Sequence, residues 1–132
     1  MNRLILAKRF SWLAGVLAVL LSMGSGCSQN GPSADPAQAE KALHAALDAW
    51  KSGSTPDEFG KNTPGIHVND LDWREGFRLV SYKPATEGRQ AGYDMNYAVT
   101  LELKSPKGKK VKKTAVYSIT TTPECLVMRQ EG

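Results

Sequence analysis

The stretch that decides the fold is residues 93–103, with the sequence YDMNYAVTLEL. Its odd-numbered positions hold only large apolar or aromatic side chains, namely Tyr93, Met95, Tyr97, Val99, Leu101 and Leu103. The even-numbered positions are polar apart from Ala98. Because successive side chains of a strand point to opposite faces, this alternation predicts one long β-strand with a buried face and a face in water.

The segments after this strand predict an antiparallel sheet. Ser105-Pro106-Lys107-Gly108 has Pro and Gly where a β-turn favours them. We therefore expect a returning strand at 111–121, with Val111, Ala115, Tyr117 and Ile119 on one face. A second turn at 122–124 leads to a short last strand at 125–129. Upstream, we expect a strand at 77–83, a loop at 86–92 and a short edge piece at 66–68.

The segment before the sheet predicts a helix at 36–52. Asp35 is a good N-cap, and Pro36 suits the first helical position. One stripe of the 3.6-residue period is apolar, formed by Ala39, Leu43, Ala46, Leu47 and Trp50. A shorter helical turn at 55–59, ended by Gly60, follows.

These elements predict an α+β fold in which the N-terminal helix packs on a curved antiparallel meander of three to four strands. A single domain would cover residues 36–132. The element order resembles that of the cystatin-like and NTF2-like rolls. The resemblance implies that the helix lies across the inner face of the sheet.

The first 26 residues differ from the rest. Residues 1–9 hold Arg3, Lys8 and Arg9 and no acid, and a largely apolar stretch of 13 residues follows at 11–23. A helix that spans a bilayer needs about 20 apolar residues. The pattern therefore predicts a cleaved signal segment at 1–26.

Residues 21–27, LSMGSGC, resemble the lipobox of bacterial lipoproteins. The resemblance implies that Cys27 is thioether-linked to diacylglycerol, becomes the first residue and is acylated, for example with palmitate. Several acyl chains suffice for stable anchoring, since each buried methylene contributes about 0.8 kcal/mol. Ser28 after the cysteine resembles the pattern of lipoproteins on the periplasmic face of the outer membrane. The alternative is plain secretion, with cleavage near Gly26.

Residues 27–35 are rich in Ser, Gly, Pro and Asn and predict a flexible tether. Beyond residue 26 the chain carries 14 Lys and Arg against 13 Asp and Glu, a net charge of +1. This balance gives no support to nucleic acid as a partner.

Few residues suggest chemistry. The cluster Asp70-Leu71-Asp72-Trp73-Arg74-Glu75 holds paired carboxylates, but a turn in which Asn69 and Asp70 bond their own backbone is the simpler interpretation. His44 and His67 lack carboxylates at ligand spacing, so no metal site is expected. Known catalytic and cofactor motifs are missing from the sequence. We therefore expect no cofactor and favour a protein that is not an enzyme.

Cys125 would be unpaired if Cys27 carries lipid. Its apolar neighbours predict a small buried hydrophobic side chain, and the alternative is a reactive thiol. Trp73 is expected in the core, and the alternative is a surface anchor for a partner.

Six lysines surround the 105–108 turn: Lys104, Lys107, Lys109, Lys110, Lys112 and Lys113. They are either solvated residues that protect a sheet edge or a docking site for anionic lipid headgroups or acidic envelope polymers. The leading hypothesis is a lipid-anchored envelope protein with a non-catalytic domain that binds a partner protein or polymer. The alternative is a roll-fold small-molecule binder or enzyme with a pocket near Tyr93, Tyr97 and Trp73.

Overall fold

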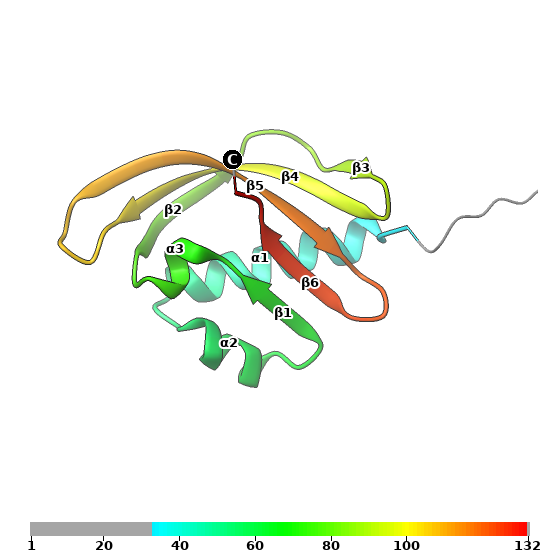
Figure 1. Cartoon of the computed structure of the whole chain (residues 1–132), viewed down its shortest axis with the longest axis horizontal. Coiled ribbons are helices and arrows are strands. Elements are labelled where there is room, and N and C mark those ends of the chain that lie inside the picture. Colours follow the sequence, from blue (N-terminus) through cyan, green and yellow to red (C-terminus); the bar gives the residue numbers. More distant parts are fainter. Residues whose placement is uncertain (1–32, 132) are drawn as a thin grey trace, which may run out of the picture. The chain divides into compact units, whose positions relative to one another are not determined.

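The structure is a computed structural model that describes residues 33–131. The predicted signal segment 1–26, the predicted lipidation at Cys27 and tether residues 27–32 lie outside the described residues. The described chain folds as a mixed α+β domain, in which a sheet with mainly antiparallel pairing curls around one long helix (Figure 1).

The long helix α1 (Pro36–Lys51) forms as predicted. The side chain of Asp35 accepts a hydrogen bond of 3.2 Å from the backbone N–H of Ala37, which satisfies one of the free donors of the first turn. Its buried stripe consists of Ala39, Ala42, Leu43, Ala46, Leu47 and Trp50. This stripe faces the sheet and forms one side of the core.

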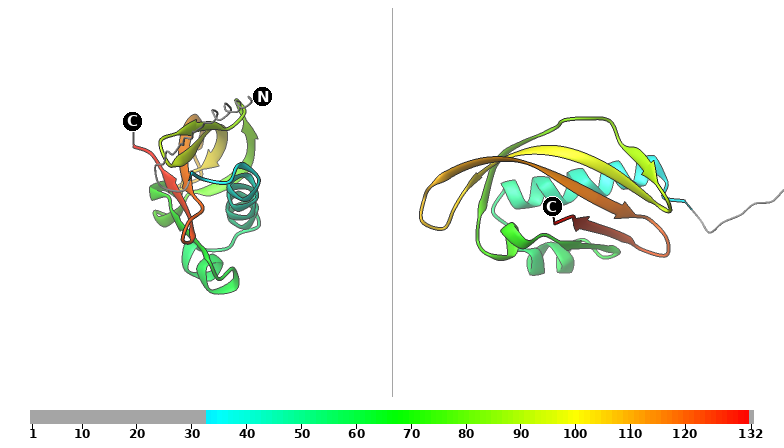
Figure 2. Two further views of the ribbon diagram at one scale, coloured as in Figure 1. Left: turned by 90° about the vertical axis from the view of Figure 1, so that its right-hand side faces the viewer. Right: turned by 45° about the horizontal axis from the view of Figure 1, so that its top comes forward.

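The sheet has the strand order β1-β6-β5-β4-β2. Its members are β1 (Ile66–Asn69), β2 (Arg78–Pro84), β4 (Asp94–Lys104), β5 (Lys110–Thr120) and β6 (Cys125–Arg129). The short strand β3 (Arg89–Ala91) also pairs with β4. Figure 2 shows from two further sides how the sheet wraps over α1.

The predicted alternation along β4 is confirmed from Met95 onwards. Met95, Tyr97, Val99, Leu101 and Leu103 are all buried in the core. On β5, Ala115, Tyr117 and Ile119 are buried as expected, and Val111 is half-buried.

Tyr93 is the exception in this stretch. Its side chain is 54% exposed, because β4 begins only at Asp94 and Tyr93 stays in the preceding turn. The prediction that Tyr93 points inward was wrong.

The prediction of a three- to four-stranded meander was also wrong, because the sheet has six strands. β1 pairs with β6 in parallel, with Ile66 opposite Cys125. The chain then crosses to β2 at the other edge of the sheet. Sequential hairpins cannot produce this pairing, because parallel neighbours need a crossover connection.

Two shorter segments also differ from expectation. The loop predicted at 86–92 contains β3, and the turn predicted at 70–75 contains a one-turn helix, α3 (Leu71–Arg74). The second helix α2 (Pro56–Asn62) begins with the predicted Thr55 cap but continues past Gly60. A reciprocal capping box, in which Thr55 and Glu58 bond each other's backbone N–H, supports its first turn.

Candidate functional site

The β4–β5 hairpin ends in a tight turn that Ser105 closes from both sides. The backbone N–H of Gly108 donates to Ser105 O at 2.8 Å, and the backbone N–H of Lys109 donates to Ser105 Oγ at 3.0 Å. Gly108 has a φ of 87°, a left-handed conformation that favours glycine. The turn therefore holds the surrounding lysines on a defined scaffold.

Five of the six predicted lysines gather at this turn, and we call them the lysine tip: Lys104, Lys107, Lys109, Lys110 and Lys112. All five are exposed. Lys104 and Lys110 are direct register partners, so two like charges stand side by side on the outer face of the sheet. Among residues 33–131, none of the five forms an ion pair.

Lys113 does not belong to this surface. It is the register partner of Leu101 and lies on the inner face, where its Nζ donates to Asp72 Oδ2 at 2.9 Å. Because side chains alternate along β5, Lys112 and Lys113 point to opposite faces of the sheet. The structure thus removes Lys113 from the predicted docking set.

Lys113 is part of a group that we call the ionic cluster: Asp70, Asp72, Lys113, Tyr117 and Arg129. Arg129 bridges the two carboxylates, with Nη1 at 2.9 Å from Asp70 Oδ1 and Nη2 at 2.8 Å from Asp72 Oδ2. The hydroxyl of Tyr117 donates to Asp70 Oδ2 at 2.6 Å. Asp70 is only 1% exposed, so the cluster neutralises a charge inside the domain.

The pKa shifts in the cluster follow from this geometry. Burial acts to raise the pKa of Asp72, but hydrogen bonds from Lys113 and Arg129 outweigh it and bring the pKa below its usual value. Burial and the charge of Asp70 raise the pKa of Tyr117 well above its usual value. Its hydroxyl therefore stays protonated and can donate to the carboxylate.

The cluster is a structural clamp with both carboxylates occupied by donors. Neither Asp70 nor Asp72 lines either of the two hollows described below. The predicted turn interpretation holds in part, because Asp70 Oδ1 accepts from the backbone N–H of Trp73 at 3.2 Å. Asn69 instead accepts a hydrogen bond from Arg74.

Sequence reasoning did not identify three members of the cluster as partners of these acids. Lys113 lies 41 residues from Asp72, while Tyr117 and Arg129 lie 47 and 59 residues from Asp70. The one usable signal was local: the charged Arg129 ends an otherwise apolar last strand. Nothing near it in the sequence indicated its partners.

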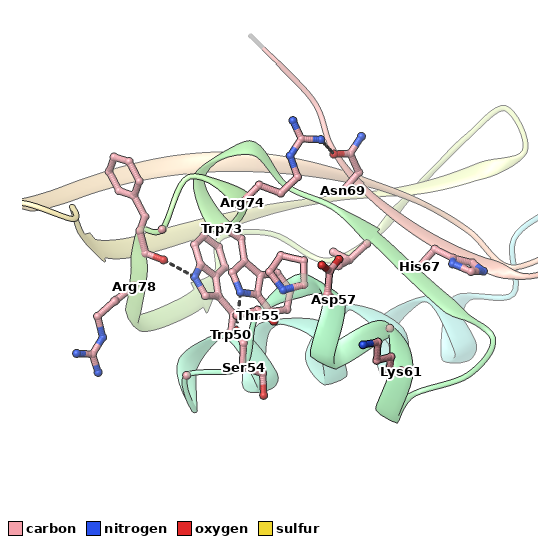
Figure 3. A pocket seen from close by; sticks show the side chains of 16 residues that line it. Trp50, Ser54, Thr55, Asp57, Lys61, His67, Asn69, Trp73, Arg74 and Arg78 are labelled. Carbon is pink, nitrogen blue, oxygen red and sulfur yellow. Dashed lines mark hydrogen bonds between the residues drawn. The ribbon is translucent and has the colours of Figure 1, made fainter.

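An open hollow of about 1210 Å³ lies between α2, β1 and the segment after α3 (Figure 3). Trp50 and Trp73 form its floor, stacked with ring centroids 5.5 Å apart. Their indole N–H groups donate to Phe77 O and Ser54 O, each at 2.7 Å. Trp73 is 5% exposed, which confirms its predicted place in the core.

Tyr93, Tyr97 and Trp73, where a pocket was expected, do not share either of the two hollows found within residues 33–131. Trp73 lines the hollow above, whereas Tyr97 lines a second one of about 540 Å³ beside His44 and residues 84–88. Tyr93 lines neither of these two hollows. The concave face of the sheet, where a roll-fold pocket would lie, is filled by α1.

The remaining candidate side chains take ordinary roles. His44 Nδ1 lies 3.0 Å from the hydroxyl of Tyr82, which donates to Asp48. His67 lies 3.2 Å from Glu124 on the surface. Residues 33–131 contain no group of three or more His, Cys, Asp or Glu side chains that could hold a metal ion. Cys125 is half-buried at the edge of the core and forms no disulfide within the described part of the chain.

No protein-family model, curated protein or solved structure matches this chain. Among the described helices, none combines the length and the apolar character that crossing a membrane requires. Function therefore has to be argued from the geometry of the domain and from the N-terminal sequence.

Proposed function

We propose that this protein is an exported lipoprotein of the cell envelope, anchored through lipid on Cys27, whose domain binds an anionic surface through the lysine tip. The lipobox resemblance of residues 21–27 supports the anchor. The Ser28 pattern supports the periplasmic face of the outer membrane as its location. The role of the domain is binding rather than catalysis, because its buried carboxylates are occupied by Arg129, Lys113 and Tyr117.

The observation that carries the docking proposal is the set of five exposed ammonium groups on one hairpin. Within residues 33–131, the one acidic residue opposite any of them in the β4–β5 register is Glu102, which faces Lys112 and accepts a hydrogen bond from Ser81. A lysine near an anionic surface contributes about 1 kcal/mol, so five together give appreciable affinity. Because the lysines are in water, salt should weaken the binding strongly.

The anchor is tested by the intact mass of the membrane-extracted protein, which reports cleavage and acylation together. We expect loss of residues 1–26 and a gain in mass from the acyl chains. The Cys27→Ser variant should be lighter and leave the membrane pellet, whereas Cys125→Ser should behave like the natural protein. A Cys27→Ser protein that stays in the pellet at unchanged mass would refute the anchor.

Docking is tested separately by a triple charge reversal, K107E/K109E/K110E. The control K41E/K51E/K83E changes the net charge equally at three exposed lysines elsewhere on the domain. We expect the first variant to lose association with envelope polymers and the second to keep it. Equal losses would mean that net charge alone matters, and the lysine tip would then not be a site.

A further inference from the structure

The chain enters the domain at a fixed point, which we call the entry end. The backbone N–H of Ala34 donates to Tyr93 O at 2.8 Å, and that of Asp35 donates to Thr121 Oγ1 at 2.9 Å. Ala34 and Thr121 are both buried. The entry point is thus held where β4 begins and β5 ends.

The lysine tip lies at the opposite end of the same two strands. β4 runs from Asp94 at the entry end to Lys104 at the tip. Ten steps at a strand rise of about 3.3 Å give roughly 33 Å along its path. Figure 1 and the right view of Figure 2 show the start of the described chain and the β4–β5 turn at the two extremes of the domain.

The sequence between Cys27 and Ala34 limits how the domain can stand on a bilayer. Seven residue steps span at most roughly 25 Å when fully extended. This is shorter than the path of β4, which disfavours an inverted domain that stands on its tip. The entry end stays near the bilayer, and the tip points away from it or, if the domain tilts over, to the side.

The composition of the lysine tip favours a polymer over a lipid surface as its partner. The lysine tip has no aromatic residue among 104–112 and therefore lacks the side chains that insert into a lipid interface. A charged surface without an apolar centre also differs from the usual interface between two folded proteins.

We propose that the lysine tip faces away from the anchoring membrane and binds an anionic polymer that lies beyond the domain, so that the protein bridges bilayer and polymer. This inference rests on the proposed anchor and docking site. It adds the direction in which the lysine tip points relative to the membrane and the class of partner that it binds. A polymer with repeated carboxylate or phosphate groups matches five ammonium groups that recognise charge rather than shape.

Energy transfer to a membrane dye tests the direction. The full lipidated protein, in the Cys125→Ser background, is placed in phosphatidylethanolamine–phosphatidylglycerol vesicles. One sample carries a donor at Lys107→Cys in the tip, and a matched sample carries it at Ala91→Cys near the entry end. We expect markedly weaker transfer from the tip. Equal transfer, or stronger transfer from the tip, would show the domain lying against its own membrane and would overturn the proposal.

Capture of fluorescent polyglutamate and of polyphosphate by the same vesicles tests the partner. We expect retention of at least one polymer, with binding weakened about 100-fold in K107E/K109E/K110E and unchanged in K41E/K51E/K83E. Retention of neither polymer would overturn the partner class. Failure of the natural protein to stay on vesicles at all would refute the anchor instead, so the two failures are distinguishable.

Discussion

Arg129 donates a hydrogen bond of 2.9 Å from Nη1 to Asp70 Oδ1, although 59 residues separate the two in the sequence. The bond joins the last strand to the N-terminus of α3, and both side chains are withdrawn from water. Removal of one partner from such a pair leaves the other as an uncompensated buried charge.

The first prediction concerns this pair. Arg129→Met keeps most of the side-chain volume but removes the charge, so we expect the free energy of unfolding to fall by about 3–5 kcal/mol. Urea denaturation of the variant and of Arg89→Met, which changes an exposed arginine on β3, provides the comparison. The control should change by less than about 0.5 kcal/mol. A similar small change for both would mean that the Arg129–Asp70 pair does not hold the fold together.

The second prediction concerns acid. The folded-state pKa of Asp72 lies below its unfolded value of 3.8, so its ionised form favours folding. This contribution is present above about pH 4 and is lost as the pH falls through the folded pKa. The stability gap between Asp72→Asn and the natural protein should therefore be widest at neutral pH and close on acidification.

Thermal unfolding over a pH series measures this gap. Leu71→Ala serves as the control, because it changes an exposed neighbour that does not titrate. The control curve should run parallel to that of the natural protein. A gap for Asp72→Asn that stays constant below pH 4 would show that the ion pairs of this residue do not favour folding.

The third prediction separates two adjacent lysines. Lys113→Glu brings a second carboxylate against Asp72, so we expect a loss of about 1–3 kcal/mol in stability. Lys112→Glu, on the outer face, should leave stability within about 0.5 kcal/mol and weaken binding to anionic polymer. Chemical denaturation and polymer binding measured on both variants should thus give opposite rankings. The same ranking in both assays would contradict the assignment of the two residues to opposite faces.

The fourth prediction concerns two glycines. A Cβ at Gly88 would overlap the ring of Tyr97 and the side chain of Met95, whereas a Cβ at Gly60 would meet nothing within 4 Å. Gly88→Ala should therefore cost about 1–3 kcal/mol through overpacking. Gly60→Ala, inside α2, should stabilise the protein by about 0.5–1 kcal/mol. If Gly88→Ala also stabilises, the segment 84–88 does not pack on Tyr97 as described.

Several parts of the fold could be predicted because their signals are local. The helix period and the Asp35–Pro36 start define α1, and the alternation from Met95 to Leu103 defines β4 and its buried face. These predictions hold because each depends on residues within one or two turns or strand repeats. The prediction that Tyr93 points inward failed because the alternation does not tell where a strand begins.

The sequence predicted where the candidate site lies, but not which of the six lysines belong to it. The turn residues at 105–108 placed the lysines around one hairpin, as the structure shows. Counting lysines along the chain could not assign Lys113 to Asp72, because that contact depends on α3 packing against the inner side of β5. The prediction that Tyr93, Tyr97 and Trp73 share a small-molecule pocket failed for a similar reason, since α1 already fills the concave face of the sheet.

The sequence alone determined the long elements α1, β4 and β5 and which face of each turns inward, because these follow from backbone period and side-chain polarity within short windows. Only the tertiary structure decided the parallel pairing of β1 with β6, the closure of Arg129 onto Asp70 and the separation of the lysine tip from the entry end. Each of these joins segments far apart in the chain, and such contacts are selected by how the whole core closes rather than by local preference.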